Sequence, residues 1–388
     1  MKNIVILGLV SLLTDVSSEM VYPLLPLFLT GLGATPSIIG IIEGIAESLA
    51  SLLKVYSGYI ADKYRKRKRL TIIGYGTSVL NKVLLAAASS WAWVLCARVI
   101  DRFGKGIRTA PRDVLIAEAA KENEKGRAFG LHRAMDTLGA VIGVAIAFFL
   151  LQNYKGDYVS IFLISIVPAA LGVLLLFFVK EKDSGMKAAK SISLKWSLLD
   201  GRLKAYLIMA FLFTLGNSSN QFLLLRASNA KGGLGFDSQT VILLYLLYNV
   251  VYAVLSYPAG RLSDKIGRKY LLISGYFLYG AVYLGFALIT RKEYVWLLFA
   301  AYGLYIAAAE GVEKAFIADV APEELKGTML GLHATLVGIG LLPASFIAGV
   351  LWDVFNASAP FYFGAFMGFA AALYLMALFG NRRDKAPV

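Results

Sequence analysis

Cysteine and histidine are nearly absent from this sequence. Cys96 is its one cysteine, and His132 and His333 are its two histidines. A single cysteine excludes a disulfide framework within one chain, and this supply of thiols and imidazoles is too small for a Cys/His metal cluster. The sequence also lacks a Gly-x-x-x-x-Gly-Lys-Ser/Thr phosphate loop and a His-Glu-x-x-His zinc motif. We therefore expect no metal, no cofactor and no enzymatic activity.

Charge is scarce as well. Only 16% of the 388 residues are charged, whereas 58% are hydrophobic, and the mean hydropathy of +0.66 is too high for a soluble domain of this size. A membrane helix needs about 20 mostly apolar residues. Runs of this kind predict twelve spans, of which the first is interpreted as a retained span and not as a removed signal. They start near residues 4, 36, 70, 91, 128, 158, 204, 237, 269, 293, 327 and 357.

The net charge of +14 is concentrated in alternate loops and in the C-terminal tail. The positive-inside rule places these segments, and with them both termini, in the cytoplasm. We therefore expect an integral protein of a prokaryotic plasma membrane, monomeric and without a nucleic-acid partner. The segments assigned to this side, which together are rich in Lys and Arg, are 62–69, 121–127, 180–204, 264–269, 322–327 and 381–385.

The two halves of the sequence resemble each other. GLHRAMDTLG at 130–139 matches GLHATLVGIG at 331–340, an offset of 201 residues, and GYIADKYRKRK at 58–68 matches GRLSDKIGRKY at 260–270 at an offset of 202. An even number of spans in each copy predicts a parallel repeat about an axis along the membrane normal. The predicted parts are a six-helix bundle at 1–180, a basic cytoplasmic linker at 181–203, and a second bundle with a short tail at 204–388.

The segment that contains Gly260, Asp264 and Lys265, followed by Gly267 and Arg268, resembles the loop signature of the major facilitator superfamily. In the first copy of the segment, Arg65 stands at the position of Gly267, where the family usually has glycine. The resemblance implies an all-α membrane fold of two pseudo-symmetric six-helix bundles. It also implies a gate that closes the cytoplasmic side. The candidate gating residues are Gly58, Asp62, Arg98, Gly260, Asp264 and Arg268.

The most unusual span carries seven charged residues in RVIDRFGKGIRTAPRD at 98–113. At 100° per residue all seven fall within an arc of about 140°. Charges at membrane depth are costly and face a protein interior or a water-filled cavity. Spacing along the helix offers Asp101 as the partner of Arg98, but it leaves a surplus of cations. We therefore expect Arg102, Lys105 and Arg108 to contact the substrate.

Carboxylates and amides supply the other candidates. Asp15, Glu19 and Glu43 lie in apolar spans, and with Asp101 they are candidate proton-coupling residues because a charged carboxylate there is costly. The seventh span has uncharged polar side chains instead, and these are further candidates for substrate binding: Asn217, Asn220 and Gln221.

The sequence predicts a secondary active transporter that moves a small organic solute by alternating access. A lining rich in cations favours an anionic or zwitterionic solute, protons are the expected coupling ion, and we prefer export by proton antiport. Three alternatives stay open. They are a proton-coupled multidrug exporter of cationic lipophiles, a lysolipid flippase, and a membrane scaffold or sensor that transports nothing.

Overall fold

A computed structural model describes residues 2–64, 67–120, 125–154, 156–181, 201–320 and 326–379. The regular secondary structure of the described part is helical, apart from one isolated bridge between Ser228 and Phe236. Its helices make twelve passes, as the sequence predicted. The first half comprises α1 (Lys2–Val21), η1 (Tyr22–Leu24), α2 (Leu25–Gly31), α3 (Pro36–Tyr64), α4 (Arg67–Ala86), α5 (Trp91–Ala119), α6 (Lys125–Asn153) and α7 (Tyr158–Leu176).

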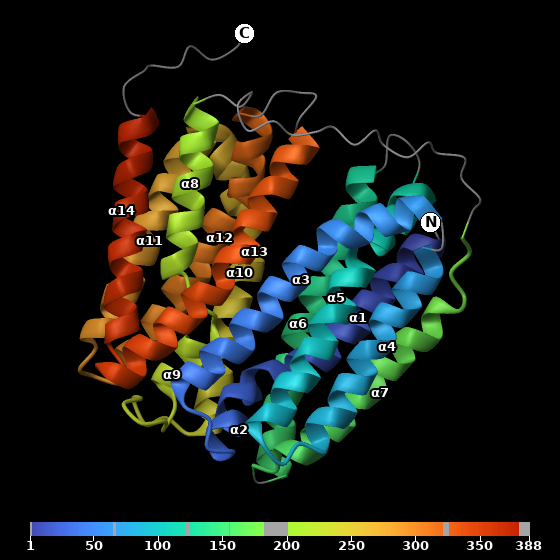
Figure 1. The fold of residues 1–388 in the computed structure, drawn as a ribbon, viewed down its shortest axis with the longest axis horizontal. Helices are drawn as coiled ribbons and strands as arrows, with labels where there is room; N and C mark the ends of the chain where they lie inside the picture. The colour runs from blue at the N-terminus through green and yellow to red at the C-terminus, as the bar shows by residue number, and fades with distance from the viewer. Residues whose placement is uncertain are drawn as a thin grey trace. The chain divides into compact units, whose positions relative to one another are not determined.

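The second half repeats this order of helices (Figure 1). It comprises α8 (Gly201–Gly216), α9 (Gln221–Ala227), α10 (Ser238–Ile266), α11 (Arg268–Leu288), α12 (Tyr294–Val320), α13 (Lys326–Val354) and α14 (Ala359–Phe379). Two passes are not the single helices that hydropathy predicts. The first is interrupted by η1, where Pro23 and Pro26 remove backbone donors, and the seventh breaks between Gly216 and Gln221.

Contacts divide the chain into two compact units. One contains Met1–Ser191 with Ser219–Leu246, and the other contains Ile192–Ser218 with Leu247–Val388. The predicted boundary at a basic linker stays a prediction, because residues 182–200 lie outside the described part of the chain.

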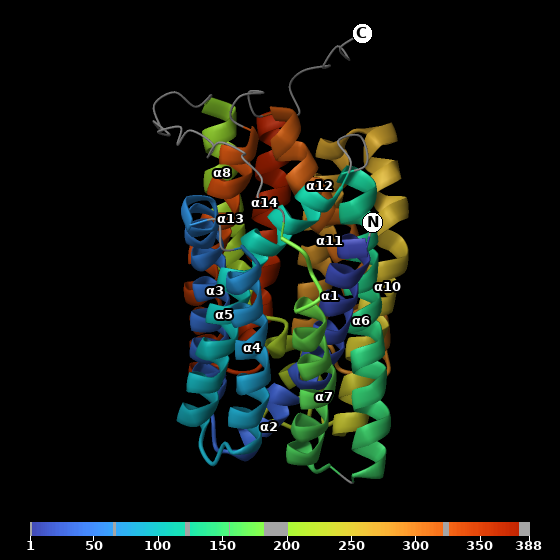
Figure 2. The same cartoon turned by 90° about the vertical axis from the view of Figure 1, so that its right-hand side faces the viewer.

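The same helix pairs pack together in both units (Figure 2). In the first unit α1 packs on α6 and α7, and α4 packs on α5 and α7; in the second unit α8 packs on α13 and α14, and α11 packs on α12 and α14. Glycines at equivalent positions allow the close approaches. A Cβ atom on Gly139 of α6 would lie 2.9 Å from Leu12 Cα, and one on Gly340 of α13 would lie 2.9 Å from Thr214 Cγ2.

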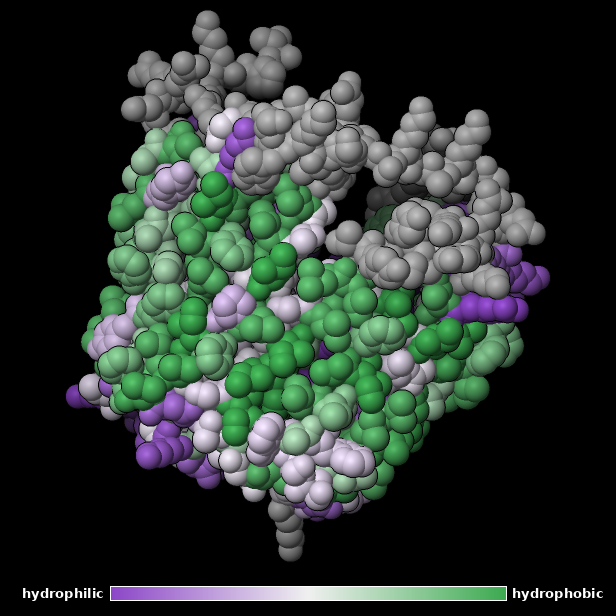
Figure 3. Space-filling view, in the orientation of Figure 1, coloured by the Kyte–Doolittle hydropathy of each residue, from purple (hydrophilic) through white to green (hydrophobic). Residues whose placement is uncertain are grey.

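Large apolar side chains cover the flanks of the helices (Figure 3). Phe149, Phe178, Leu297 and Phe366 are each more than 60% exposed, which suits contact with lipid and not with water. Within the described residues, ten passes are long and apolar enough to cross a membrane. The helices α4 and α5 are the other two, and the charged face of α5 lowers its hydropathy.

Candidate functional site

The helix α5 packs against both α3 and α4 because two glycines face them. A Cβ atom on Gly104 would lie 2.6 Å from Gly74 O of α4, and one on Gly106 would lie 3.2 Å from Ala50 O of α3. Ser57 of α3 also donates a hydrogen bond to Gly106 O, with an oxygen–oxygen distance of 2.9 Å. The close approach turns the charged face of α5 toward these neighbours, as the spacing predicted. Phe103 is on the opposite face and is 46% exposed.

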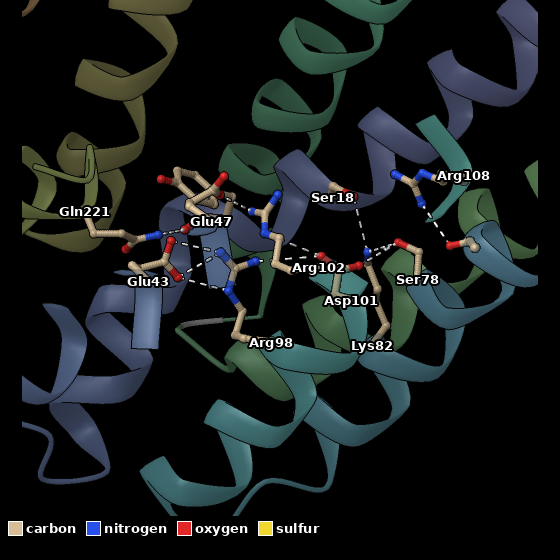
Figure 4. A network of polar contacts seen from close by, with 12 residues as sticks. Ser18, Glu43, Glu47, Ser78, Lys82, Arg98, Asp101, Arg102, Arg108 and Gln221 are labelled. Carbon is tan, nitrogen blue, oxygen red and sulfur yellow. Dashed lines mark hydrogen bonds and ion pairs between the residues drawn. The ribbon is translucent and has the colours of Figure 1, made fainter. Parts of the chain in front are cut away.

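Arg98 and Glu43 form a bidentate pair between α5 and α3. Arg98 Nε and Nη2 donate to the two carboxylate oxygens of Glu43, each at 2.9 Å. Both residues are buried, with 3% and 1% exposure. Asp101, the partner that helical spacing offers, lies 3.8 Å from Arg98 Nη1. The candidate gating residue Arg98 and the candidate proton carrier Glu43 therefore occupy one ion pair (Figure 4).

Arg102 lies between two carboxylates. Its Nη2 atom is 3.0 Å from Glu47 Oε1 of α3, and its Nε atom is 4.0 Å from Asp101 Oδ2. The Glu47 side chain is 32% exposed, so this pair is accessible, unlike the pair of Arg98 with Glu43. Arg102 thus has an anionic partner that an incoming anion could replace.

Asp101 belongs to a polar cluster that sequence reasoning missed. Ser78 Oγ of α4 donates to Asp101 Oδ1 at 3.1 Å, and Lys82 Nζ donates to Ser78 Oγ at 2.9 Å and to Ser18 Oγ of α1 at 3.3 Å (Figure 4). Lys82 is 1% exposed. One lysine inside the apolar run NKVLLA was the available signal, since an intramembrane cation indicates a functional or paired residue.

The remaining two cations of the predicted substrate site differ from each other. The guanidinium of Arg108 lies 4.2 Å from the centre of the Tyr75 ring, and Nη1 donates to Gly74 O at 3.3 Å. Arg108 is therefore held by α4. Lys105 is half-buried, and within the described part of the chain its ammonium forms no hydrogen bond or ion pair. The charges that act on it most strongly belong to Arg102, Glu47 and Asp15.

The carboxylates of α1 have different partners. The Asp15 carboxyl group lies near that of Asp136 on α6, a proximity that sequence reasoning did not find. Glu19 accepts a hydrogen bond of 2.7 Å from the hydroxyl of Tyr245, which belongs to the same compact unit. The candidate proton carriers thus lie in separate environments, although Asp15 and Glu19 both face the cations of α5.

The polar stretch of the seventh pass lies where that pass is broken. Gln221 is fully buried at the start of α9, and its Nε2 atom donates to Tyr22 O at 3.3 Å. Its Oε1 atom has no hydrogen-bond partner among the described residues. Asn217 and Asn220 lie in the break itself. Gln221 is therefore the best placed of the three amides to accept a hydrogen bond from a ligand.

The second loop signature forms a compact turn. Gly267 has a φ of 96°, which glycine adopts without a side-chain clash. Arg268 Nη2 lies 3.4 Å from Asp264 Oδ1, and Arg268 Nη1 donates to Ala315 O of α12 at 2.7 Å. Gly260 lies in open space one turn before Asp264. In the first copy the side chains of residues 58–66, a range that includes Gly58 and Asp62, lie outside the described residues.

Comparison with known proteins identifies the family. The family model of the Major Facilitator Superfamily matches residues 7–227 and again residues 206–388. The chain belongs to this superfamily. It is 39% identical over 379 residues to the uncharacterized MFS-type transporter MJ1317 of Methanocaldococcus jannaschii, an alignment that covers 97% of this chain and 94% of that one. Major facilitator proteins are transporters and not enzymes, so this chain is a secondary transporter integral to the membrane.

More distant major facilitator proteins share the fold. The nucleoside transporter NupG superposes with a TM-score of 0.78 at 14% identity, covering 98% of this chain and 100% of that chain. A D-xylose-proton symporter superposes with a TM-score of 0.73 at 16% identity, covering 96% of each chain. Among sequence relatives, the multidrug resistance protein MdtH of Yersinia enterocolitica is 24% identical, with 85% of this chain and 82% of that one covered. The structural likenesses confirm the predicted fold, and the family match and the relative at 39% identity show a transporter of unspecified substrate.

Proposed function

We propose that this transporter carries a small anionic or zwitterionic organic solute, coupled to protons and in the direction of export. The observation that carries the proposal is the Lys105 ammonium, which forms no ion pair within the described residues on a helix where Arg98 and Arg102 have carboxylate partners. A cation at membrane depth without an ion-pair partner is costly. An anion that pairs with it would recover part of that cost.

Arg102 supplies the second contact of the proposed site. A guanidinium binds a carboxylate or phosphate through two parallel hydrogen bonds, whereas an ammonium acts as a point charge. Glu47 forms an ion pair with Arg102 in this structure, and because the Glu47 side chain is partly exposed, another anion can replace it. The solute anion would therefore displace Glu47 from Arg102 and approach Lys105. Gln221 Oε1 offers an acceptor for the amino group of a zwitterion.

A ligand screen tests the charge of the substrate. Purified protein is heated with citrate, glutamate, glucose 6-phosphate or the lipophilic cation tetraphenylphosphonium, and the melting temperature is recorded. At least one anion should raise it, and Lys105→Gln should remove that shift while Lys105→Arg restores it. Arg291→Gln is the matched control, because it removes the same charge from an exposed loop residue.

The same screen distinguishes the proposed anion transporter from the main alternative, a multidrug exporter of cationic lipophiles. MdtH, a relative at 24% identity, is named a multidrug resistance protein, and Glu47 could also receive a cation. If tetraphenylphosphonium stabilises the wild type, and Lys105→Gln binds it as well or better, the multidrug exporter replaces the present proposal. Uptake of a stabilising anion into inside-out vesicles, with and without an imposed pH gradient, tests coupling and direction. Uptake that ignores the gradient contradicts proton coupling.

The cytoplasmic gate is a further part of the proposal. Arg268 joins Asp264 at the end of α10 to the backbone of α12, so this turn can hold three helices together at one membrane face. We assign the same role to Gly58 and Asp62 because they occupy the equivalent positions of the repeat. Asp264→Asn should slow transport while leaving the melting temperature within about 2 °C of wild type, since Asp264 is exposed. Unchanged transport would reduce the turn to a membrane anchor. By the positive-inside rule, the basic loops also favour termini on the cytoplasmic side.

A further inference from the structure

Three helices of the second unit meet at the side chain of Glu313 on α12. Tyr276 of α11 donates a hydrogen bond of 2.6 Å to Glu313 Oε1. The other carboxylate oxygen, Oε2, lies 3.9 Å from the Nε2 atom of His333 on α13. Tyr276 is fully buried and His333 is 7% exposed. Glu313 is therefore bonded to α11, while it faces a buried imidazole of α13 across a short gap.

This gap separates an acid from a base. A distance of 3.9 Å is too long for a hydrogen bond, and the buried Nε2 atom of His333 has no hydrogen-bond partner among the described residues. A buried polar atom without a partner is costly. An ionised carboxylate only accepts hydrogen bonds, whereas a protonated carboxyl group or an imidazolium can donate one. Uptake of a proton by Glu313 or His333 therefore provides a donor that can close the gap between α12 and α13.

The repeat supplies a counterpart with the opposite charge. At the offset of 201 residues, His333 corresponds to His132, and Glu313 corresponds to Arg112. His132 is also buried, and its Nε2 atom likewise has no hydrogen-bond partner in the described part of the chain. Among the charges that act on His132, that of Arg112 is the strongest. Because arginine stays protonated, a proton on His132 is repelled at the position where Glu313 would attract one.

We propose that Glu313 and His333 bind one exchangeable proton between α12 and α13, and that Tyr276 helps to set the pH at which it binds. The carbonyl oxygen of Ala315, two residues after Glu313, accepts a hydrogen bond from Arg268 of the proposed gate. Proton uptake would thus attach α13 to a helix that the gate turn holds. The inference rests on the proposed function for this consequence, whereas the proton site itself depends only on the contact between the side chains.

The surroundings of the pair leave the proton exchangeable. The Glu313 side chain keeps 18% exposure, which gives protons access to the pair. Lys314 Nζ lies 3.9 Å from Glu310 Oε1, so the two nearest charges partly offset each other. The sequence of α14, which also packs on α13, has no charged residue. The titratable groups around the pair are Tyr276 of α11, Tyr206 of α8, and Tyr305, Glu310 and Lys314 of α12.

Nuclear magnetic resonance of the purified, substrate-free transporter with isotope-labelled histidine tests the pair, because the chain has only two histidines. His132→Gln assigns the two sets of signals. The ring nitrogen signals of His333 should change in one step as the pH is varied across the neutral range, whereas those of His132 should stay constant. Glu313→Gln should abolish the step. The matched control is Glu293→Gln, the same change at an exposed residue before α12, and it should leave the step in place.

Tyr276→Phe provides a second test, with a defined direction. The hydroxyl group of Tyr276 stabilises an ionised Glu313, so without it the pair should hold its proton to a higher pH. A hydrogen bond to a charged group predicts that the step moves upward by about 1–2 pH units. If Glu313→Gln fails to fold, this variant decides, and an unmoved step contradicts the proposal.

Two further outcomes would overturn the inference. One is a His333 ring that keeps the same neutral form at every pH, which would make the contact a fixed hydrogen bond. The other is a step that Glu313→Gln leaves unchanged. The measurement uses no substrate and no gradient, so it is independent of the proposed function. A confirmed step in a protein whose transport ignores pH would reject the proposed coupling, whereas proton-driven transport without a step would reject only this site.

Discussion

Replacing Glu43 by glutamine is the sharpest test of how the charges of α5 are tolerated. The change keeps the shape of the side chain and removes its charge. Arg98 would then be a cation at 3% exposure whose nearest carboxylate oxygen, on Asp101, lies 3.8 Å away instead of 2.8 Å. Removing one partner of a buried ion pair costs about 3–5 kcal/mol, because the other charge stays buried. We expect Glu43→Gln to lose stability in this range.

The double variant Glu43→Met/Arg98→Met gives the comparison that isolates the pair. Replacing both members of a buried pair by apolar residues of similar volume is neutral or stabilising by about 1–4 kcal/mol. Reversible unfolding in mixed micelles, followed by tryptophan fluorescence, measures the free energy of unfolding of both variants. The double variant should therefore be more stable than Glu43→Gln, although it carries more substitutions.

The opposite order of stability would refute this reasoning. If Glu43→Gln unfolds like the wild type, the bidentate contact contributes no stability and Glu43 returns as a proton carrier. Proton-driven transport distinguishes the two roles further. A structural Glu43 predicts that a folded Glu43→Gln transporter still responds to a pH gradient, whereas a proton carrier predicts that it does not.

Three further predictions concern packing and the polar cluster. Gly139→Ala should destabilise the protein because its Cβ atom meets the backbone of Leu12, whereas Gly130→Ala, in open space, should not; equal melting temperatures would contradict this contact. Gly267→Ala should lower the free energy of unfolding by about 1–3 kcal/mol because alanine is strained at a φ of 96°, whereas Gly260→Ala in the preceding helix should not lower it. A Gly267→Ala variant as stable as the wild type would contradict the positive φ of this turn. Lys82→Met should lower the free energy of unfolding by less than Glu43→Gln, because Asp101 keeps Ser78 and two arginines; an equal loss would make Lys82 its main partner.

Hydropathy located the helices well because each pass has to be apolar over a length fixed by the bilayer. The passes predicted to start near residues 36, 91 and 158 begin at those residues, and the pass predicted near 237 begins at Ser238. The breaks in the first and seventh passes were not predicted. A break near two prolines was readable in YPLLP, but the break at Asn217–Asn220 depends on contacts made elsewhere in the fold.

The periodicity of the sequence predicted which face of α5 is buried, but it could not predict the neighbouring helix. Helical spacing relates residues three or four apart, so it offered Asp101 to Arg98. The bidentate partner is Glu43, which lies 55 positions away in the sequence. For the same reason the proximity of Asp15 to Asp136 was missed. A repeat offset shows which positions are equivalent, and it carries no information on which helices pack together.

The repeat also shows that the fold does not need the charges of the first half. At the offset of 201 residues, the cluster of Ser78, Lys82 and Asp101 corresponds to three tyrosines, Tyr279, Tyr283 and Tyr302. The rings of Tyr279 and Tyr283 lie 4.1 Å apart, those of Tyr283 and Tyr302 lie 6.3 Å apart, and the Tyr279 hydroxyl donates to Gly216 O at 2.8 Å.

Equivalent helix pairs therefore pack around an aromatic cluster in one unit and around an ionic cluster in the other. Aromatic side chains fill such a contact without the desolvation cost of buried charges. A scaffold with no transport function would gain stability by using them in both units. The ionic cluster of the first unit is thus retained at a cost to stability, which is expected where a membrane protein has to bind ions or charged solutes.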